Sequence, residues 1–216
     1  MIRAVIFDMD GVLIDTEPLH YRVWKQVFEE QGLTIDFEHY KGCIGSTAGR
    51  LFELMWEHYG RNFSSDPAIP ARFRTVKTGI IEAEGLPVMP GAVECVRALK
   101  AAGYRLAVAS SSPQDYIEDC MKRLGIDDCF ERLFSAERVG RPKPAPDVFL
   151  ETAKHLGVRP GDCIVVEDSH NGSRAAAAAG MCCIGLQNPH SGEQDLSAAD
   201  WIVTELAPIP ELIRGL

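Results

Sequence analysis

The stretch VIFDMDGVLIDTE, residues 5–17, places two acids where a run of apolar residues ends. Ile2 and the run from Val5 to Phe7 predict a strand that is covered on both faces, as in a parallel sheet. One acid is ordinary at a strand end, because Asp and Gly form turns and Asp caps helices. Two acids, Asp8 and Asp10, repel each other beside apolar cover unless a positive group binds them. The pair therefore indicates a cation or a reaction.

The chain from residue 91 onward alternates helical and strand patterns. Helices are expected at residues 91–101, 113–124, 147–156 and 172–180, and strands at 104–109, 132–135, 163–167, 182–186 and, as an edge, 201–205. This βα order predicts an α/β fold with a doubly wound (Rossmann-like) parallel sheet. The first strand must join that sheet, because an isolated strand cannot pair its backbone groups.

Between the first strand and this alternating region the patterns are helical only. Apolar residues recur at three- and four-residue steps over residues 18–31, and further helical signals cover about 47–59 and 70–84. We therefore predict a helical insertion at residues 16–86, within a core formed by residues 1–15 and 87–216. The stretch EGLPVMPG, residues 84–91, has the Gly and Pro content of a hinge.

Composition narrows the class of protein. The chain has 216 residues, 46% of them hydrophobic, with a mean hydropathy of -0.06, which suits a globular protein. A formal net charge of -9 argues against nucleic acid or an anionic membrane surface as a partner. No secretory signal is recognised, because Asp8 and Asp10 interrupt the apolar N-terminal run. We expect a cytoplasmic protein that is a monomer or a weak homodimer.

The seven cysteines are odd in number and form no C-x-x-C pair. Cys182 and Cys183 are neighbours on an expected strand, where successive side chains point to opposite faces, so a shared metal is not expected. We interpret the cysteines as reduced, mostly structural thiols.

Ligands of open parallel sheets bind outside the carboxyl ends of the strands, so the residues after each expected strand matter most. Four strand ends carry polar groups: Asp8 and Asp10, then Ser110, Ser111 and Ser112, then Lys143, then Glu167 and Asp168. Each has an ordinary explanation, since serines before Pro113 can cap a helix, Lys143 can be a solvated loop charge, and Asp168 can cap the next helix. Their coincidence on four strand ends favours a functional site.

The chemistry of these groups is consistent with a phosphate and a hard cation. The candidate ligands for Mg²⁺ are Asp8, Asp10 and Asp168. Ser110 can donate its hydroxyl to a phosphoryl oxygen, and backbone N–H groups around Ser111 can add donors. Lys143 can neutralise the remaining phosphate charge.

Four ordered stretches, DMDGVLIDTE (8–17), VASSSP (108–113), GRPKPAPDVF (140–149) and VVEDSHNG (165–172), are similar to the four motifs of one family. The sequence resembles the haloacid dehalogenase superfamily of hydrolases, in its β-phosphoglucomutase-like and sugar-phosphate-phosphatase branch. The helical insertion is similar to the small α-helical cap of that branch. The resemblance implies a Mg²⁺-dependent phosphatase that acts on a small phosphorylated metabolite, in particular a sugar phosphate, through an aspartyl phosphate.

Carried over by position, the resemblance implies a role for each strand-end residue. Asp8 becomes the nucleophile, and Asp10 protonates the leaving alcohol and then activates water. Ser110 and Lys143 hold the phosphoryl group. The implied metal ligands are Asp168, the side chain of Asp8 and the backbone carbonyl of Asp10. Glu167 either binds the metal directly or contacts the residues that bind it.

The cap decides between two reactions of the family. Thr16 and His20, just after the first motif, are candidate substrate-binding residues, although His20 also suits an exposed helix position. In the loop CIGSTAGRL, residues 43–51, β-phosphoglucomutases usually carry an arginine that grips a second phosphate, and here Thr47 stands among small residues with Arg50 displaced. Thr47 is a further candidate substrate-binding residue. This difference favours hydrolysis, with a phosphosugar mutase as the alternative.

Two other readings fit the sequence less well. Displacement of chloride by a 2-haloacid dehalogenase needs neither a proton donor at Asp10 nor the metal carboxylates, and all of these are present. A phospho-accepting signalling module also combines strand-end acids, a hydroxyl and a lysine on a doubly wound sheet. Such modules do not normally carry an inserted cap or a D-x-D pair.

Overall fold

The computed structural model describes residues 1–41, 44, 48–61, 63 and 66–216. The chain divides into two compact units. The first comprises Met1–Asp15 and Val88–Leu216, and the second comprises Thr16–Pro87.

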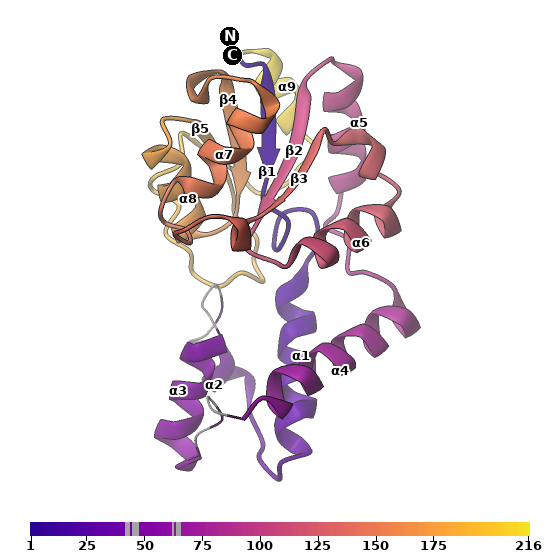
Figure 1. Cartoon of the computed structure of the whole chain (residues 1–216), viewed down its shortest axis with the longest axis vertical. Coiled ribbons are helices and arrows are strands. Elements are labelled where there is room, and N and C mark those ends of the chain that lie inside the picture. The colour runs from indigo at the N-terminus through magenta and orange to yellow at the C-terminus, as the bar shows by residue number, and fades with distance from the viewer. Residues whose placement is uncertain (42–43, 45–47, 62, 64–65) are drawn as a thin grey trace. The chain divides into compact units, whose positions relative to one another are not determined.

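The first unit is built on one six-stranded sheet (Figure 1). Its strands are β1 (Ala4–Phe7), β2 (Arg105–Ser110), β3 (Arg132–Ser135), β4 (Cys163–Glu167), β5 (Cys182–Leu186) and β6 (Trp201–Val203). Their order is β3-β2-β1-β4-β5-β6, and each neighbouring pair is parallel. The predicted doubly wound parallel sheet is confirmed, and β6 lies at its edge as expected.

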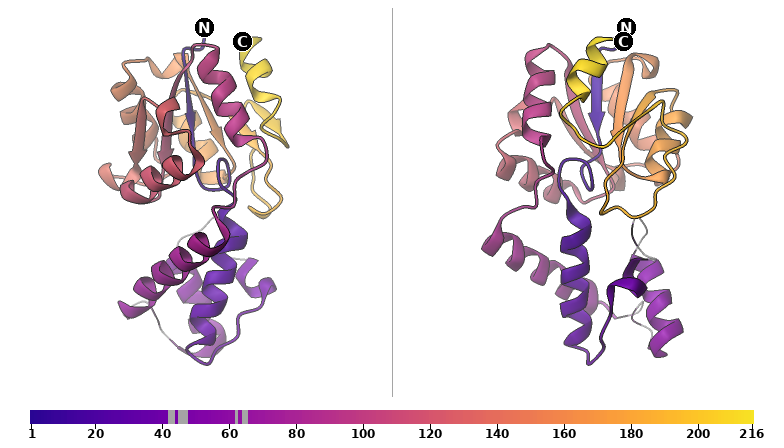
Figure 2. Two further views of the ribbon diagram at one scale, coloured as in Figure 1. Left: turned by 90° about the vertical axis from the view of Figure 1, so that its right-hand side faces the viewer. Right: turned by 180° about the vertical axis from the view of Figure 1, so that it is seen from behind.

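Helices cover both faces of this sheet. They are α5 (Ala92–Ala101), α6 (Gln114–Leu124), α7 (Asp147–Leu156), α8 (His170–Ala178) and α9 (Ile209–Arg214), with short 3-10 turns at Asp127–Cys129, Ala136–Arg138 and Pro160–Asp162. Helices α5 and α9 pack side by side, whereas α7 and α8 pack against each other on the other face (Figure 2). The sheet is therefore buried on both sides, which explains the apolar runs in β1 and β4.

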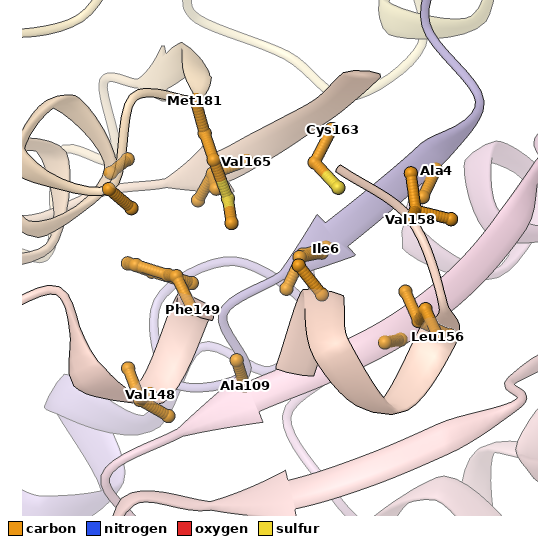
Figure 3. Packing of buried hydrophobic residues seen from close by; sticks show 14 of the residues in the cluster. Ala4, Ile6, Ala109, Val148, Phe149, Leu156, Val158, Cys163, Val165 and Met181 are labelled. Carbon is orange, nitrogen blue, oxygen red and sulfur yellow. The ribbon is translucent and has the colours of Figure 1, made fainter. Parts of the chain in front are cut away.

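One core cluster fills the space between the sheet and the α7–α8 face (Figure 3). Ile6, Ala109 and Val165 contribute from three adjacent strands, and Phe149 and Leu156 contribute from α7. All five are at most 1% exposed. This packing fixes the ends of the strands, and with them the loops that follow.

The second unit consists of α1 (Thr16–Glu29), α2 (Phe37–Lys41), α3 (Ala48–Tyr59) and α4 (Ala68–Glu84). Its described residues form helices and no strand, as the sequence predicts. Trp24 stacks on Phe28 with ring centroids 5.5 Å apart and lies 4.3 Å from the Phe73 ring. Trp24 belongs to the core of this unit, since it is only 8% exposed.

Some boundaries differ from the sequence-based ones for identifiable reasons. Helix α9, for which no prediction was made from the sequence, begins at Ile209 between Pro208 and Pro210, because Pro is tolerated in the first turn of a helix. Helix α8 begins at His170, two residues before the predicted start, because the Ser169 hydroxyl accepts a hydrogen bond from the Gly172 N–H and caps the helix. The short helix α2 carries too little periodicity to be predicted.

None of the described cysteines forms a disulfide, and all of them but Cys182 are buried. Cys43 lies outside the described residues. None of the helices in the described part of the chain is both long and apolar enough to cross a bilayer.

Candidate active site

The predicted site residues gather where the order of the sheet reverses. Strand β1 pairs with β2 on one side and with β4 on the other, so the chain leaves the sheet there toward opposite faces. The Asp8 N–H donates to the Val166 carbonyl at 2.9 Å, which holds Asp8 beside the end of β4. Asp8, Glu167 and Asp168 are buried, with 7%, 1% and 6% exposure.

Lys143 lies between two of these acids. Its Nζ donates to Asp8 Oδ1 at 2.6 Å, to Glu167 Oε1 at 2.7 Å and to the Ala109 carbonyl at 3.2 Å. The ammonium also lies 4.9 Å from the ring centroid of Phe149, at the start of α7. Lys143 is thus a buried cation bound to the strand ends, and the reading as a solvated loop charge is wrong.

The buried carboxyls do not ionise easily. The pKa of Asp8 is raised to about 7, chiefly by burial; Lys143 opposes this rise, whereas the charges of Glu167 and Asp10 add to it. Burial, followed by the charges of Glu167 and Asp8, raises the pKa of Asp168 well above its usual value. Burial would lower the pKa of Lys143, but Asp8 and Glu167 raise it above its usual value. One lysine therefore faces several acids, and the cluster carries an excess of potential negative charge.

Asp10 is held from the end of β2. Its Oδ2 accepts hydrogen bonds from the Ser112 hydroxyl at 2.8 Å and from the Ser110 hydroxyl at 3.3 Å. Its Oδ1 is buried and has no hydrogen-bond partner among the described residues. Ser110 is fully buried, so its hydroxyl belongs to the site, while Ser111 is exposed and only its backbone was expected to act.

Two glycines make room for the acids. Gly11 has a φ of +81°, which permits the tight turn after Asp10, and a Cβ there would lie 1.9 Å from Asp168 Oδ2. A Cβ at Gly172 would lie 1.7 Å from Glu167 Oε1. Any larger residue at either position would displace a carboxylate of the cluster.

The protein itself satisfies both carboxylate oxygens of Glu167. Its Oε1 accepts from Lys143, and its Oε2 accepts from the N–H groups of Asp168 and Ser169 at 3.0 and 2.9 Å and from the Ser169 hydroxyl at 2.8 Å. This arrangement suits a residue that supports Lys143 and the start of α8. A direct bond from Glu167 to a metal stays a prediction.

The remaining acids fit Mg²⁺. Among the described residues, no three His, Cys, Asp or Glu side chains are grouped so that they could hold a metal by themselves. Mg²⁺ does not require such a group, because it usually takes one or two carboxylates and completes its shell with waters and substrate phosphate. Asp8 and Asp168 supply two neighbouring carboxylates. In addition, Asp10 Oδ1 is buried without a hydrogen-bond partner among the described residues, as expected for a site that binds a further polar group.

Sequence reasoning missed two sets of residues in the site. Ser112 was named among the polar groups at its strand end but was given no role, yet it makes a shorter hydrogen bond to Asp10 than Ser110 does. Asn188 and Ser191, in the loop after β5, contact Gly11 and Asp168. No motif or periodicity marks these positions, because the contacts join segments that are far apart in the chain.

The three predicted substrate-binding residues of the insertion belong to the second unit. Thr16 begins α1 and is buried, and its Oγ1 has no hydrogen-bond partner among the described residues. His20 Nε2 lies 3.1 Å from Lys77 Nζ, and its ring packs against Phe73 at 5.6 Å. Thr47 lies outside the described residues. Substrate binding by these three residues stays a prediction.

Comparison with known proteins agrees with this geometry. The family model of haloacid dehalogenase-like hydrolases matches residues 2–180. The chain belongs to this family. It is 37% identical over 193 residues to protein YhcW of Bacillus subtilis, a match that covers 89% of this chain and 86% of YhcW. It is 34% identical over 188 residues to the fructose-1-phosphate phosphatase YqaB of Escherichia coli, covering 85% of this chain and 96% of YqaB.

Solved structures of this family share the whole fold. The crystal structure of β-phosphoglucomutase from Clostridium difficile superposes with a TM-score of 0.80 at 26% identity, covering 100% of this chain and 96% of that chain. Phosphatases are among the relatives in sequence, and a phosphoglucomutase is among those in structure. This haloacid dehalogenase-like hydrolase is accordingly an enzyme of the phosphatase type.

Proposed function

We propose that this enzyme hydrolyses phosphate monoesters of small metabolites, in particular sugar phosphates, with Mg²⁺ and through an aspartyl phosphate on Asp8. The observation that carries the proposal is the contact of 2.6 Å between the buried Lys143 ammonium and Asp8 at the end of β1. A buried acid paired with a fixed cation can act on an anionic substrate, because the cation offsets the repulsion between them. Fructose 1-phosphate, named for the relative YqaB, is a representative of the substrate class.

In the first step a carboxylate oxygen of Asp8 attacks the phosphorus atom. A bond forms between this oxygen and phosphorus, and the ester P–O bond to the leaving alcohol breaks. With a pKa of about 7, a substantial fraction of Asp8 is ionised at neutral pH. A bound Mg²⁺ would favour the ionised form further.

Asp10 is placed to move the proton. Its protonated carboxyl gives a proton to the leaving alkoxide, and the resulting carboxylate then takes a proton from the water that attacks the phosphoryl group. Hydrogen bonds from Ser112 and Ser110 hold Oδ2 and leave Oδ1 without a partner among the described residues, so Oδ1 is the atom that we assign to proton transfer. Hydrolysis releases inorganic phosphate and regenerates Asp8.

The transferred phosphoryl group needs donors on its other oxygens. The Ser110 hydroxyl and the backbone N–H of Ser111 follow β2, and Lys143 approaches from the loop before α7. We assign these groups to phosphoryl binding, where charge-assisted hydrogen bonds are strong. For Ser110 this requires that its weak bond to Asp10, 3.3 Å long, is exchanged for one to the substrate.

Mg²⁺ would be held by the side chains of Asp8 and Asp168 and by the backbone carbonyl of Asp10. When bound, it supplies positive charge that offsets the repulsion between the carboxylate and the phosphate. Glu167 would support this set by orienting Lys143, from which it accepts a hydrogen bond at 2.7 Å.

The test is release of inorganic phosphate from a panel of phosphomonoesters, with Mg²⁺ and with EDTA. We expect release from one or more hexose or pentose phosphates with Mg²⁺ only. A second candidate function, that of a phosphosugar mutase, is supported by the structural similarity to β-phosphoglucomutase over the whole chain. Absence of phosphate release from the whole panel, with interconversion of a sugar phosphate instead, would favour that function.

A further inference from the structure

The loop after β5, residues 187–192, is folded onto itself and fastened to the turn that follows Asp10; we call it the β5 loop. Asn188 is 4% exposed, and its Nδ2 donates to the Gly11 carbonyl at 3.1 Å. Its Oδ1 accepts from the His190 N–H at 2.9 Å, and its carbonyl accepts from the Ser191 N–H at 3.1 Å. The position of Ser191 is thereby tied to the turn at Gly11.

Ser191 is itself buried, with 4% exposure, and its hydroxyl donates a hydrogen bond to Asp168 Oδ2. The same oxygen is enclosed from another side by Gly11, where even a Cβ would approach within 1.9 Å. No hydrogen bond reaches Asp168 Oδ1 from the described residues. The two oxygens of this carboxylate are therefore distinct: one is bound by the protein, and the other has no protein partner.

A carboxylate needs such a restraint to act as a ligand at a fixed point. The terminal torsion of Asp is broad and roughly two-fold, so the side chain alone does not define where either oxygen lies. A single hydrogen bond to Oδ2, made by a side chain that is fastened to the backbone at Gly11, selects one orientation. Residues that orient metal ligands in this way influence metal affinity strongly.

We propose that Ser191 is a positioning residue that holds Asp168 Oδ2 and so presents Asp168 Oδ1 to Mg²⁺. The inference rests on the proposed function, because it takes Asp168 as a metal ligand. It goes beyond it by assigning a role to the β5 loop, which lies outside the four motifs. Ser191 touches neither substrate nor metal and acts only through Asp168.

A purely structural role makes a different prediction. If Ser191 only satisfied a buried carboxyl, its loss would lower the stability of the metal-free protein and leave the intrinsic affinity for Mg²⁺ unchanged. If it positions Asp168, its loss raises the Kd for Mg²⁺ even where the protein is fully folded. Metal binding measured without substrate therefore separates the two roles.

The experiment compares Ser191→Ala, Ser191→Thr and wild type by calorimetric titration of the metal-free protein with Mg²⁺. We expect Ser191→Ala to raise the Kd by about ten- to a hundredfold. Ser191→Thr keeps the hydroxyl and should stay within about threefold of wild type. The matched control is Ser197→Ala, which should not change the Kd. Ser197 lies six residues after Ser191, is exposed, and forms a hydrogen bond with Asp195.

Two further readouts keep the result unambiguous. With saturating Mg²⁺, Ser191→Ala should regain most of its kcat with little change in the KM for the phosphate ester, because substrate contacts are intact. If Ser191→Ala does not fold, Ser191→Cys replaces it, since a thiol keeps the volume and donates hydrogen bonds poorly. A Kd within twofold of wild type in the folded Ala or Cys variant would overturn the role of Ser191. Wild-type protein that binds no Mg²⁺ and releases no phosphate would instead overturn the proposed function.

Discussion

Lys143 Nζ lies 2.6 Å from Asp8 Oδ1, and the two side chains are only 7% and 9% exposed. The lysine reaches Asp8 from 135 residues along the chain and also pairs with Glu167. Charges in such a place are stabilised by each other, since little water reaches them. The pair thus links the nucleophile that we propose to the stability of the core.

Replacing this lysine tests the link. In Lys143→Met the buried acids lose their cation, and we expect the free energy of unfolding at pH 8 with EDTA to fall by about 3–5 kcal/mol. Phosphate release should fall at least a hundredfold. Lys154→Met on α7 is the control, because that lysine is 74% exposed and pairs with Glu151, which is itself 40% exposed. Equal stability of the two variants in urea unfolding would contradict a structural role for the buried pair.

The same variant gives a prediction for pH. Lys143 lowers the pKa of Asp8, so its removal leaves that pKa even further above the usual value of 3.8. An acid whose folded-state pKa is raised binds more protons in the folded state, so stability falls as pH rises between the two values. The stability deficit of Lys143→Met in EDTA should therefore be smaller at pH 5 than at pH 8. A deficit that is independent of pH would exclude Asp8 as the group left unpaired.

Asp8→Asn tests the nucleophile. The amide keeps the volume of the carboxyl and removes its nucleophilic oxygen, so we expect a folded protein with no detectable phosphate release. Asp195→Asn, at an exposed position in the same unit, should keep wild-type activity. Mass spectrometry of rapidly quenched wild-type enzyme should find the phosphoryl group on the peptide that contains Asp8. A phosphoryl group on another residue would refute the assignment.

Gly11→Ala tests the space around Asp168. A Cβ at Gly11 would lie 1.9 Å from Asp168 Oδ2, whereas a Cβ at Gly103, which has a similar φ of +88°, would meet nothing within 4 Å. Both Ala variants should lose about 1–3 kcal/mol of stability from the left-handed backbone. Only Gly11→Ala should also lose phosphate release and Mg²⁺ binding, because it displaces Asp168. Wild-type kcat in Gly11→Ala would show that this carboxylate is not needed where it lies.

The sheet could be predicted because its signals are local. The bounds of β3, β4 and β5 agree with the predicted ones, and predicted site residues lie at or directly after the ends of β1, β2 and β4. The contacts of Asn188 and Ser191 could not be predicted in the same way. Asn188 and Gly11 are 177 positions apart, and a hydrogen bond between side chain and backbone at that separation leaves no periodic pattern in either segment. Ser112 was overlooked for a related reason, because a serine before a proline is an ordinary helix cap.

The last prediction separates a phosphatase from a mutase: given a sugar monophosphate, the enzyme should release inorganic phosphate rather than an isomer of the substrate. A mutase must keep water from its phosphoenzyme while a bisphosphorylated intermediate turns around, and it must hold the distal phosphate meanwhile. Such a grip favours a charged, bidentate donor. At the place where β-phosphoglucomutases carry an arginine, this sequence has Thr47 and Ala48.

Loss of one charge-assisted hydrogen bond typically costs about 1.5–3 kcal/mol, roughly ten- to a hundredfold in the partition between the intermediate and water. Hydrolysis should therefore dominate. The measurement follows β-glucose 1-phosphate, with a trace of the 1,6-bisphosphate, by phosphorus NMR. Arg50→Ala is the companion variant, because Arg50, in the first turn of α3, is the arginine nearest to Thr47 in the sequence, and it should not change the product ratio. Glucose 6-phosphate that accumulates faster than free phosphate, and that disappears in Arg50→Ala, would assign the missing grip to Arg50 and make the enzyme a mutase.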